Sequence, residues 1–346
     1  MCLEAQGAVN PPQLPQLFFP NAVLCTPLWE CASGILSPHF EAEQMTTFRE
    51  ILIDAETELS SADLFFGHGY ESAHDEAVAL VLAAADCSLV DTSAAILDTV
   101  YPTTALPKLR SFLTARCEER LPVAYITGEV WLGHLCFKSD ARALVPRSPV
   151  AEFVLNQFAP WYQGPDPQFI IDVCCGGGSL GMLAKSLFPS AQVLLSDLDS
   201  AALSLAVENS QIHPVDGIVR GDLLSWCGSS CADIIIANPP YVDAHDMRGL
   251  PAEYRHEPGL ALAGGKDGLD LVRVLLTDAA RILCSTGVLV LEVGNSFEAL
   301  EDLSEQLHPI WVELEQGGHG VAVFMAQDLA QWVVPKHTIH SVVSAK

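Results

Sequence analysis

The stretch Ile170–Gly181, "IIDVCCGGGSLG", decides the fold of this chain. It opens with apolar residues around Asp172 that are typical of a buried strand, and the run Gly176, Gly177 and Gly178 follows. Glycines allow the backbone to approach a ligand closely, and the helix predicted after them offers unpaired N–H groups in its first turn. The stretch therefore predicts a strand, a tight turn and a helix that together bind a nucleotide-like cofactor.

Strands alternate with helices from residue 168 onward. The apolar segments are "QFIIDVCC", "QVLLSD", "GIVRGD", "ADIIIAN" and "GVLVLEVG", with helical patterns such as "LVRVLLTDAARIL" between them. Such alternation predicts a parallel, doubly wound sheet. The final segments, "IWVELEQ" and "GVAVFMAQ", are joined by "GGH", which predicts a hairpin with an antiparallel strand. The fold class is thus α/β, with a doubly wound, seven-stranded, Rossmann-like sheet.

Acidic residues end the next two predicted strands. Asp197 lies 25 residues after Asp172, about where a doubly wound fold places an acid that binds ribose hydroxyls. Asp222 and Leu223 follow the third strand and would meet the edge and the face of an adenine. Cys174 completes the predicted wall of the cofactor site. Because an acid, Asp172, lies four residues before the first turn glycine, S-adenosylmethionine is favoured, with a dinucleotide as the alternative.

The fourth strand ends in "NPPY", Asn238 to Tyr241, and ligands of open α/β sheets bind at this end of the strands. Proline fixes its own φ and restricts the residue before it, so Asn238 and Pro239 are both constrained. The Asn238 side-chain carbonyl and the Pro239 backbone carbonyl would accept the two N–H groups of a planar NH2. We therefore predict a catalytic set of Asn238, Pro239, Pro240 and Tyr241 that orients an amino group for methyl transfer, with Tyr241 as a flat wall and Asn238 also bordering the cofactor.

Two other chemistries match short patterns in the glycine loop. Gly177, Ser179 and Gly181 fit the G-x-S-x-G pattern of hydrolases, but no clear oxyanion-hole segment precedes them. Cys174 and Cys175 are adjacent and lack partners at zinc-ligand spacing, so no metal site is expected.

The composition restricts the class of partner and the compartment. The formal net charge is -26 with a pI near 4.5, which attracts basic partners and repels phosphate backbones, so direct nucleic-acid binding is not expected. The 11 cysteines are scattered without a regular framework, as in a reduced protein. The longest apolar run, at 76–90, is too short and too charged to span a bilayer. We expect a cytoplasmic protein without a membrane partner.

The chain divides into four predicted parts. Residues 1–44 are proline-rich and form an irregular extension, and Met45 is an alternative start. Residues 45–120 repeat apolar positions every three and four residues, which indicates a small helical domain. Residues 121–150 form a connector with a β-hairpin predicted within 123–140, and residues 151–346 carry the sheet.

From about 47 to 330 the chain resembles a known family, the glutamine side-chain methyltransferases that act on peptide-chain release factors and on a large-subunit ribosomal protein. The resemblance rests on "NPPY" and on "FGHG" at 66–69, "DEAVALVL" at 75–82, "RLPVAYITG" at 120–128, "LVPRSPVAEFV" at 144–154 and "LPAEYRHEPGLALAGGKDGL" at 250–269. The release-factor branch typically reads Pro-Arg-Pro-Asp-Thr-Glu where this chain has "PRSPVAE". The likeness therefore favours the branch that acts on ribosomal protein L-three.

The resemblance implies roles for individual residues. Asp172, Gly176, Gly178, Asp197 and Asp222 would line the S-adenosylmethionine site, and the "NPPY" residues would hold a substrate glutamine. The helical domain and Arg147 would dock a basic ribosomal protein, while Arg255 and His256 either contact that substrate or pin the substrate loop. Glutamine methylation of a release factor remains an alternative, as does amino-group methylation of a nucleic-acid base.

Overall fold

The computed structural model describes residues 46–89, 93–303, 307, 309–315 and 318–331. The predicted extension at 1–44 and the alternative start at Met45 lie outside these residues. The described chain contains a seven-stranded sheet in the order β10-β11-β9-β6-β3-β4-β5. Its strands are β3 (Phe169–Val173), β4 (Gln192–Asp197), β5 (Gly217–Arg220), β6 (Ala232–Ala237), β9 (Leu283–Glu292), β10 (Ile310–Trp311) and β11 (Val321–Met325).

The pairing of the strands confirms the predicted doubly wound sheet. β3 pairs in parallel with β4 and β6, β4 pairs in parallel with β5, and β6 pairs in parallel with β9. β11 runs antiparallel to both β9 and β10, which confirms the antiparallel hairpin predicted at the end of the sheet. The strand order reverses between β3 and β6, and ligands of such sheets bind at this switch point.

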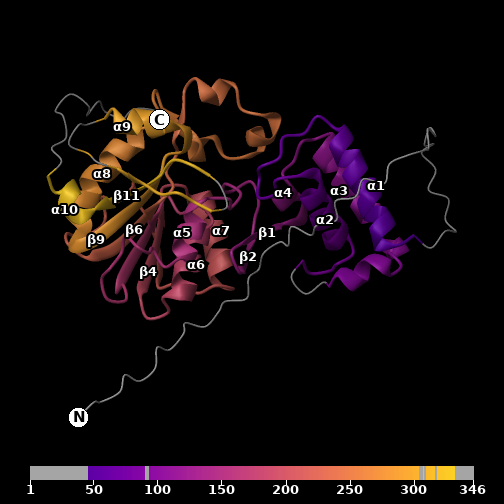
Figure 1. Ribbon diagram of the computed structural model, residues 1–346, viewed down its shortest axis with the longest axis horizontal. Coiled ribbons are helices and arrows are strands. Elements are labelled where there is room, and N and C mark those ends of the chain that lie inside the picture. Colours follow the sequence, from indigo (N-terminus) through magenta and orange to yellow (C-terminus); the bar gives the residue numbers. More distant parts are fainter. Residues whose placement is uncertain (1–45, 90–92, 304–306, 308, 316–317, 332–346) are drawn as a thin grey trace, which may run out of the picture. The chain divides into compact units, whose positions relative to one another are not determined.

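Helices cover both faces of the sheet (Figure 1). One face packs against α5 (Val150–Leu155), α6 (Ser179–Leu187) and α7 (Ser200–Ser210). The other face packs against α8 (Asp270–Ile282), α9 (Phe297–Glu301) and α10 (Ala326–Leu329). Because successive side chains of a strand point to opposite faces, strands covered on both sides read as continuous apolar runs, which is the pattern of β3 and β6.

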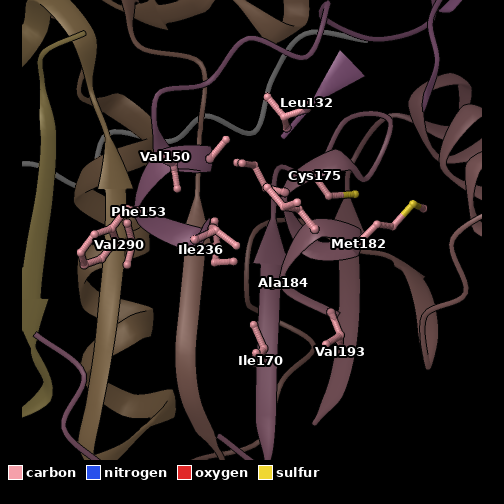
Figure 2. Packing of buried hydrophobic residues seen from close by; sticks show 14 of the residues in the cluster. Leu132, Val150, Phe153, Ile170, Cys175, Met182, Ala184, Val193, Ile236 and Val290 are labelled. Atoms are coloured by element: carbon pink, nitrogen blue, oxygen red, sulfur yellow. The ribbon is translucent and has the colours of Figure 1, made fainter. Parts of the chain in front are cut away.

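Buried apolar side chains fill the core between the sheet and the helices α5, α6 and α7 (Figure 2). Ile170 of β3, Ile236 of β6 and Val290 of β9 are completely buried there. Val150 and Phe153 of α5 belong to the same cluster, in which Phe153 is 2% exposed. Burying one such side chain stabilises the fold by about 1.5–3 kcal/mol, so this cluster holds the strand ends that carry the site in fixed register.

Among the described residues, the helical region contains four α-helices with a core of their own, and the last of them lies beyond the predicted boundary at residue 120. They are α1 (Phe48–Ser61), α2 (Ala73–Ala84), α3 (Leu106–Cys117) and α4 (Val123–Thr127). α1 begins at a capping box, in which the Thr47 side chain accepts from the backbone N–H of Glu50 and the Glu50 carboxylate accepts from the backbone N–H of Thr47. Each of the described helices is too short or too polar to traverse a bilayer.

The hairpin predicted within 123–140 is shorter than expected. β1 (Glu129–Leu132) pairs antiparallel with β2 (Leu135–Lys138), but Val123–Thr127 form α4 instead of a strand. Pro122 precedes that helix, and Gly128 ends it with φ +80, a left-handed conformation that glycine adopts without strain. The alternating apolar pattern therefore extended the predicted strand across a helical turn.

The remaining elements are short. β7 (Val242–Asp243) and β8 (Ala263–Gly265) form a parallel pair after the Asn-Pro-Pro-Tyr segment. The 3-10 helices are η1 (Ala94–Asp98), η2 (Thr103–Ala105), η3 (Asp246–Arg248), η4 (Ala252–His256), η5 (Gly259–Ala261) and η6 (Gly294–Ser296).

Candidate active site

A cavity of about 440 Å³ lies at the carboxyl ends of the parallel strands. Its walls come from the glycine loop after β3, the ends of β4 and β5, the Asn-Pro-Pro-Tyr segment after β6, and the end of β9. Residues 142–149 and several residues between 242 and 262 close it from other sides. The volume lies within the range of about 300–1,000 Å³ that small-molecule sites occupy.

The glycine loop is shaped by its own backbone and by Asp172. Gly176 borders the cavity with φ +55, whereas Gly178 lies behind it with φ +84 and caps α6. A Cβ at Gly178 would lie 2.7 Å from Leu195 Cδ1, so a larger residue would displace the loop. The buried Asp172 carboxylate accepts a 2.7 Å hydrogen bond from the Gly181 N–H, and burial raises the pKa of Asp172 to about 7.

Asp172 therefore fixes the first turn of α6 through its carboxylate. The residue also borders the cavity and is 1% exposed, and its contact with the cofactor stays a prediction. Gly178 likewise supports the loop from behind instead of lining the cavity. Cys174 does border the cavity, with φ +57, and burial raises the pKa of its thiol.

The acids after β4 and β5 lie where the sequence placed them. Asp197 borders the cavity, and its two carboxylate oxygens accept from the N–H groups of Gly176 at 2.9 Å and Asp199 at 2.8 Å. Each oxygen keeps a lone pair for a ligand hydroxyl. Asp222 and Leu223 border the same cavity, the first exposed and the second 7% exposed. An acid and an apolar side chain there suit the edge and the face of a purine.

Three residues of the predicted catalytic set face this cavity. Asn238, Pro240 and Tyr241 border it, and in the described part of the chain the Asn238 side-chain amide has no hydrogen-bond partner. Pro239 is buried and does not border the cavity. The structure thus gives no support to the Pro239 carbonyl as a second acceptor, because that residue turns into the core at the end of β6.

Tyr241 is anchored by a carboxylate from the end of β9. Its hydroxyl donates to Glu292 Oε1 at 2.8 Å, and the hydroxyl of Ser148 donates to Glu292 Oε2. Glu292 is 4% exposed, and burial raises its pKa while the two hydroxyl groups oppose that shift. Through this contact Glu292 supports the Asn-Pro-Pro-Tyr segment from the end of β9.

Only one of the three predicted docking residues borders the cavity. Arg147 does so, and its guanidinium donates to both oxygens of Glu257 at 2.5 and 2.7 Å. Arg255 is exposed outside the cavity lining, and His256 is bonded to the carbonyl of Glu119 at 2.8 Å. For His256 the geometry favours the loop-pinning alternative, because its ring nitrogen binds the chain itself.

Sequence reading missed two glutamates, Glu253 and Glu257, which flank Arg255 and His256 in the sequence. Glu257 also accepts from the Val145 N–H at 3.0 Å and lies 3.4 Å from the ring of His68. Burial would raise the pKa of Glu257, but His68 and Arg147 outweigh that effect and hold the pKa at about 2. The spacing Glu253–Glu257 around two basic residues was the available signal, yet it does not say which cations these glutamates bind.

Glu253 belongs to a second buried charge network. Arg116 of α3 donates to both oxygens of Glu76 at 2.7 and 3.0 Å, to Glu253 at 3.1 Å and to the Phe65 carbonyl at 2.9 Å. The side chains of Arg116 and Glu253 are each 1% exposed. The network ties η4, beside the cavity, to the helices of the N-terminal region.

Asn209 of α7 is a further residue that the sequence did not reveal. Its buried amide donates to the Gly177 carbonyl at 3.0 Å and to the Lys138 carbonyl at 3.2 Å, and it accepts from the Lys138 N–H at 2.8 Å. One side chain therefore joins the glycine loop to the hairpin strand β2.

The switch-point cavity, with a glycine loop on one side and Asn-Pro-Pro-Tyr on the other, defines this protein as a methyltransferase of the Rossmann-like class. Residues 153–251 match the family described as "Methyltransferase small domain". The ribosomal protein uL3 glutamine methyltransferase of Bordetella pertussis is 38% identical over 291 residues, which is 83% of this chain and 97% of that relative. The chain belongs to the family of ribosomal protein uL3 glutamine methyltransferases.

A second relative has the same name. The enzyme of the same name from Francisella tularensis is 33% identical over 302 residues, covering 83% of this chain and 92% of the relative. Among solved structures, a methyltransferase from Pyrococcus furiosus aligns with a TM-score of 0.40 and 14% identity, over 64% of this chain and 97% of its own.

Proposed function

We propose that this enzyme transfers a methyl group from S-adenosylmethionine to the side-chain amide nitrogen of a glutamine in ribosomal protein uL3. The observation that carries the proposal is the shared cavity, in which the amide of Asn238, without a partner among the described residues, lies on the same surface as the glycine loop and Asp197. The relatives named as uL3 glutamine methyltransferases support the choice of substrate.

The cofactor would occupy the part of the cavity beside β3, β4 and β5. The backbone of Gly176 permits close approach, Asp197 retains acceptor capacity for ribose hydroxyls, and Asp222 with Leu223 suits the adenine. Bound there, S-adenosylmethionine would supply an electrophilic methyl group to the cavity that the Asn-Pro-Pro-Tyr segment also borders. The residues on this wall bind and orient, and none has to exchange a proton with the methyl donor.

Asn238 and Tyr241 would prepare the nucleophile. An amide nitrogen is a poor nucleophile because its lone pair is delocalised into the carbonyl. The Asn238 side-chain oxygen can accept one N–H of the substrate amide, and the Tyr241 ring can hold the amide plane. Fixing the nitrogen in place allows a positioned displacement, in which the N–C bond forms, the S–C bond breaks, S-adenosylhomocysteine leaves and the amide nitrogen loses one proton.

The acidic character of the chain supports a basic protein substrate. A net charge of -26 attracts positively charged partners over long range and disfavours nucleic acid. We propose that the helical part, residues 45–120, docks this substrate, that residues 121–150 connect it, and that residues 151–346 carry the catalytic sheet. Arg147 would contribute to docking by shaping the cavity wall, because its guanidinium is already bound to Glu257.

The experiment is a competition between substrate classes. The full-length enzyme is incubated with methyl-labelled S-adenosylmethionine and, in parallel, with unmethylated uL3, a release factor and bare ribosomal RNA, and the label is mapped by peptide mass. Label on one glutamine of uL3 alone supports the proposal. Label on the release factor alone would keep the chemistry and overturn the substrate, and label on RNA alone would overturn both.

Asn238→Ala tests the role of the amide within the same assay. We expect turnover to fall by about 100-fold or more, because a hydrogen bond needed for orientation is lost, while the Kd for S-adenosylmethionine changes by less than about threefold. Asn156→Ala is the matched control, since Asn156 is exposed and borders no part of this cavity. Unchanged turnover in Asn238→Ala would remove the amide-orienting role.

A further inference from the structure

Glu292 holds Tyr241 by accepting a hydrogen bond from its hydroxyl. The carboxylate lies at the carboxyl end of β9 and receives one hydroxyl on each oxygen, from Tyr241 at 2.8 Å and from Ser148. Burial and the Glu292 charge raise the pKa of Tyr241 well above its usual value of 10, so the phenol stays protonated and donates. The Tyr241 hydroxyl therefore donates in this contact, which fixes the direction of the hydrogen bond.

The segment after β9 fixes the rest of Tyr241. The Ser296 hydroxyl donates to the Tyr241 carbonyl at 2.8 Å. Gly294 has φ +46, and a Cβ there would lie 2.5 Å from the Tyr241 ring, so only glycine lets the ring lie flat against this backbone. The hydroxyl, the ring and the carbonyl of Tyr241 are all held by residues 292–296.

We propose that Glu292 is a positioning residue for methyl transfer, which sets the plane of the Tyr241 ring against the substrate amide. This inference rests on the proposed function. Both Glu292 oxygens are engaged by protein hydroxyls, so the residue acts through Tyr241 and not on the substrate. A carboxylate suits this place because it accepts two hydroxyls and offers no competing donor, whereas an amide would present an NH2 group to one of them.

A double-mutant cycle tests the coupling between Glu292 and Tyr241. The full-length enzyme is compared as wild type, Glu292→Gln, Tyr241→Phe and the double variant, with kcat and KM for uL3 and the Kd for S-adenosylmethionine. We expect Glu292→Gln to lower kcat by about 10- to 100-fold, the effect of one charged hydrogen bond, with the Kd changed by less than about threefold. The double variant should lie within about threefold of Tyr241→Phe, because both changes remove the same contact.

The control is Glu298→Gln, which changes an exposed carboxylate on the neighbouring α9 and should leave kcat unaltered. Multiplying effects in the double variant, or wild-type kcat in Glu292→Gln, would overturn the inference. If Glu292→Gln does not fold, Ser148→Ala removes the second hydroxyl, and its loss of kcat should likewise disappear in the Tyr241→Phe background.

A second readout does not depend on turnover. The enzyme has 6 tyrosines, so 13Cζ-tyrosine labelling gives a resolvable spectrum in which Tyr241→Phe identifies the Tyr241 signal. Glu292→Gln should shift that signal, and an unmoved signal would overturn the contact itself. Because this spectrum needs no substrate, it judges the positioning role even if the wild-type enzyme fails to methylate uL3, an outcome that would overturn the proposed function.

Discussion

Replacing Arg116 with leucine should lower the free energy of unfolding by about 3–5 kcal/mol. The guanidinium is 1% exposed and makes four hydrogen bonds, to both oxygens of Glu76, to Glu253 and to the Phe65 carbonyl. Removing one partner of a buried ionic network leaves uncompensated charge in a medium that solvates it poorly, and the stated range is typical of that change. Leucine fills part of the volume but satisfies neither carboxylate.

The assay is urea unfolding of the full-length enzyme at pH 7, followed by circular dichroism. Arg49→Leu is the matched control, because Arg49 is 49% exposed and its bond to Asp98 lies at the surface, where such pairs contribute about 0–1 kcal/mol. Adding Glu76→Leu to Arg116→Leu should recover part of the loss by removing one stranded carboxylate. Equal losses in the Arg116 and Arg49 variants, or no recovery in the double variant, would refute the reasoning.

Three further outcomes follow from the site. Gly268→Ala should destabilise the chain by at least about 1–2 kcal/mol and impair turnover, because the φ of Gly268 is +78 and a Cβ there would lie 2.3 Å from the Tyr241 carbonyl oxygen. Thermal melts should show no comparable loss for the control Gly228→Ala, because a Cβ at Gly228 would meet nothing within 4 Å. Glu257 has a pKa of about 2 in the folded protein against an ordinary 4.5. Its contribution of about 3 kcal/mol to the free energy of unfolding is therefore present above pH 4.5 and is lost as the pH falls toward 2. Urea midpoints measured between pH 6 and 3 should drop more steeply for wild type than for Glu257→Gln. Asp197→Asn should weaken S-adenosylmethionine binding by about tenfold or more in calorimetry, and an unchanged Kd would count against its role at the ribose.

The sheet was predictable because its strands are covered on both faces. Segments such as residues 234–237 read as short apolar runs, and strands buried on two sides tolerate that pattern. The residues at strand ends were predictable for a related reason, since a doubly wound sheet gathers them at one edge. Asp197, Asp222 and Asn238 accordingly meet at one cavity.

Pairings between distant side chains were not predictable. Arg116 and Glu253 are 137 residues apart, and no periodicity connects an α3 cation to a glutamate beside the cavity. Gly178 and Pro239 were assigned to the cavity by their place in a motif, although neither residue borders it. A motif gives the location of a loop, whereas the direction of each residue depends on the packing beneath it.

The two edges of the sheet consist of short strands, β5 with four residues and β10 with two. An exposed edge recruits extended chains by offering unpaired backbone groups, and recognition of that kind reads little of the partner's sequence. Here the edges offer few such groups. An extended segment of a basic protein would therefore gain little by adding to the sheet as an extra strand, so we expect the side chains around the strand ends to select the substrate glutamine.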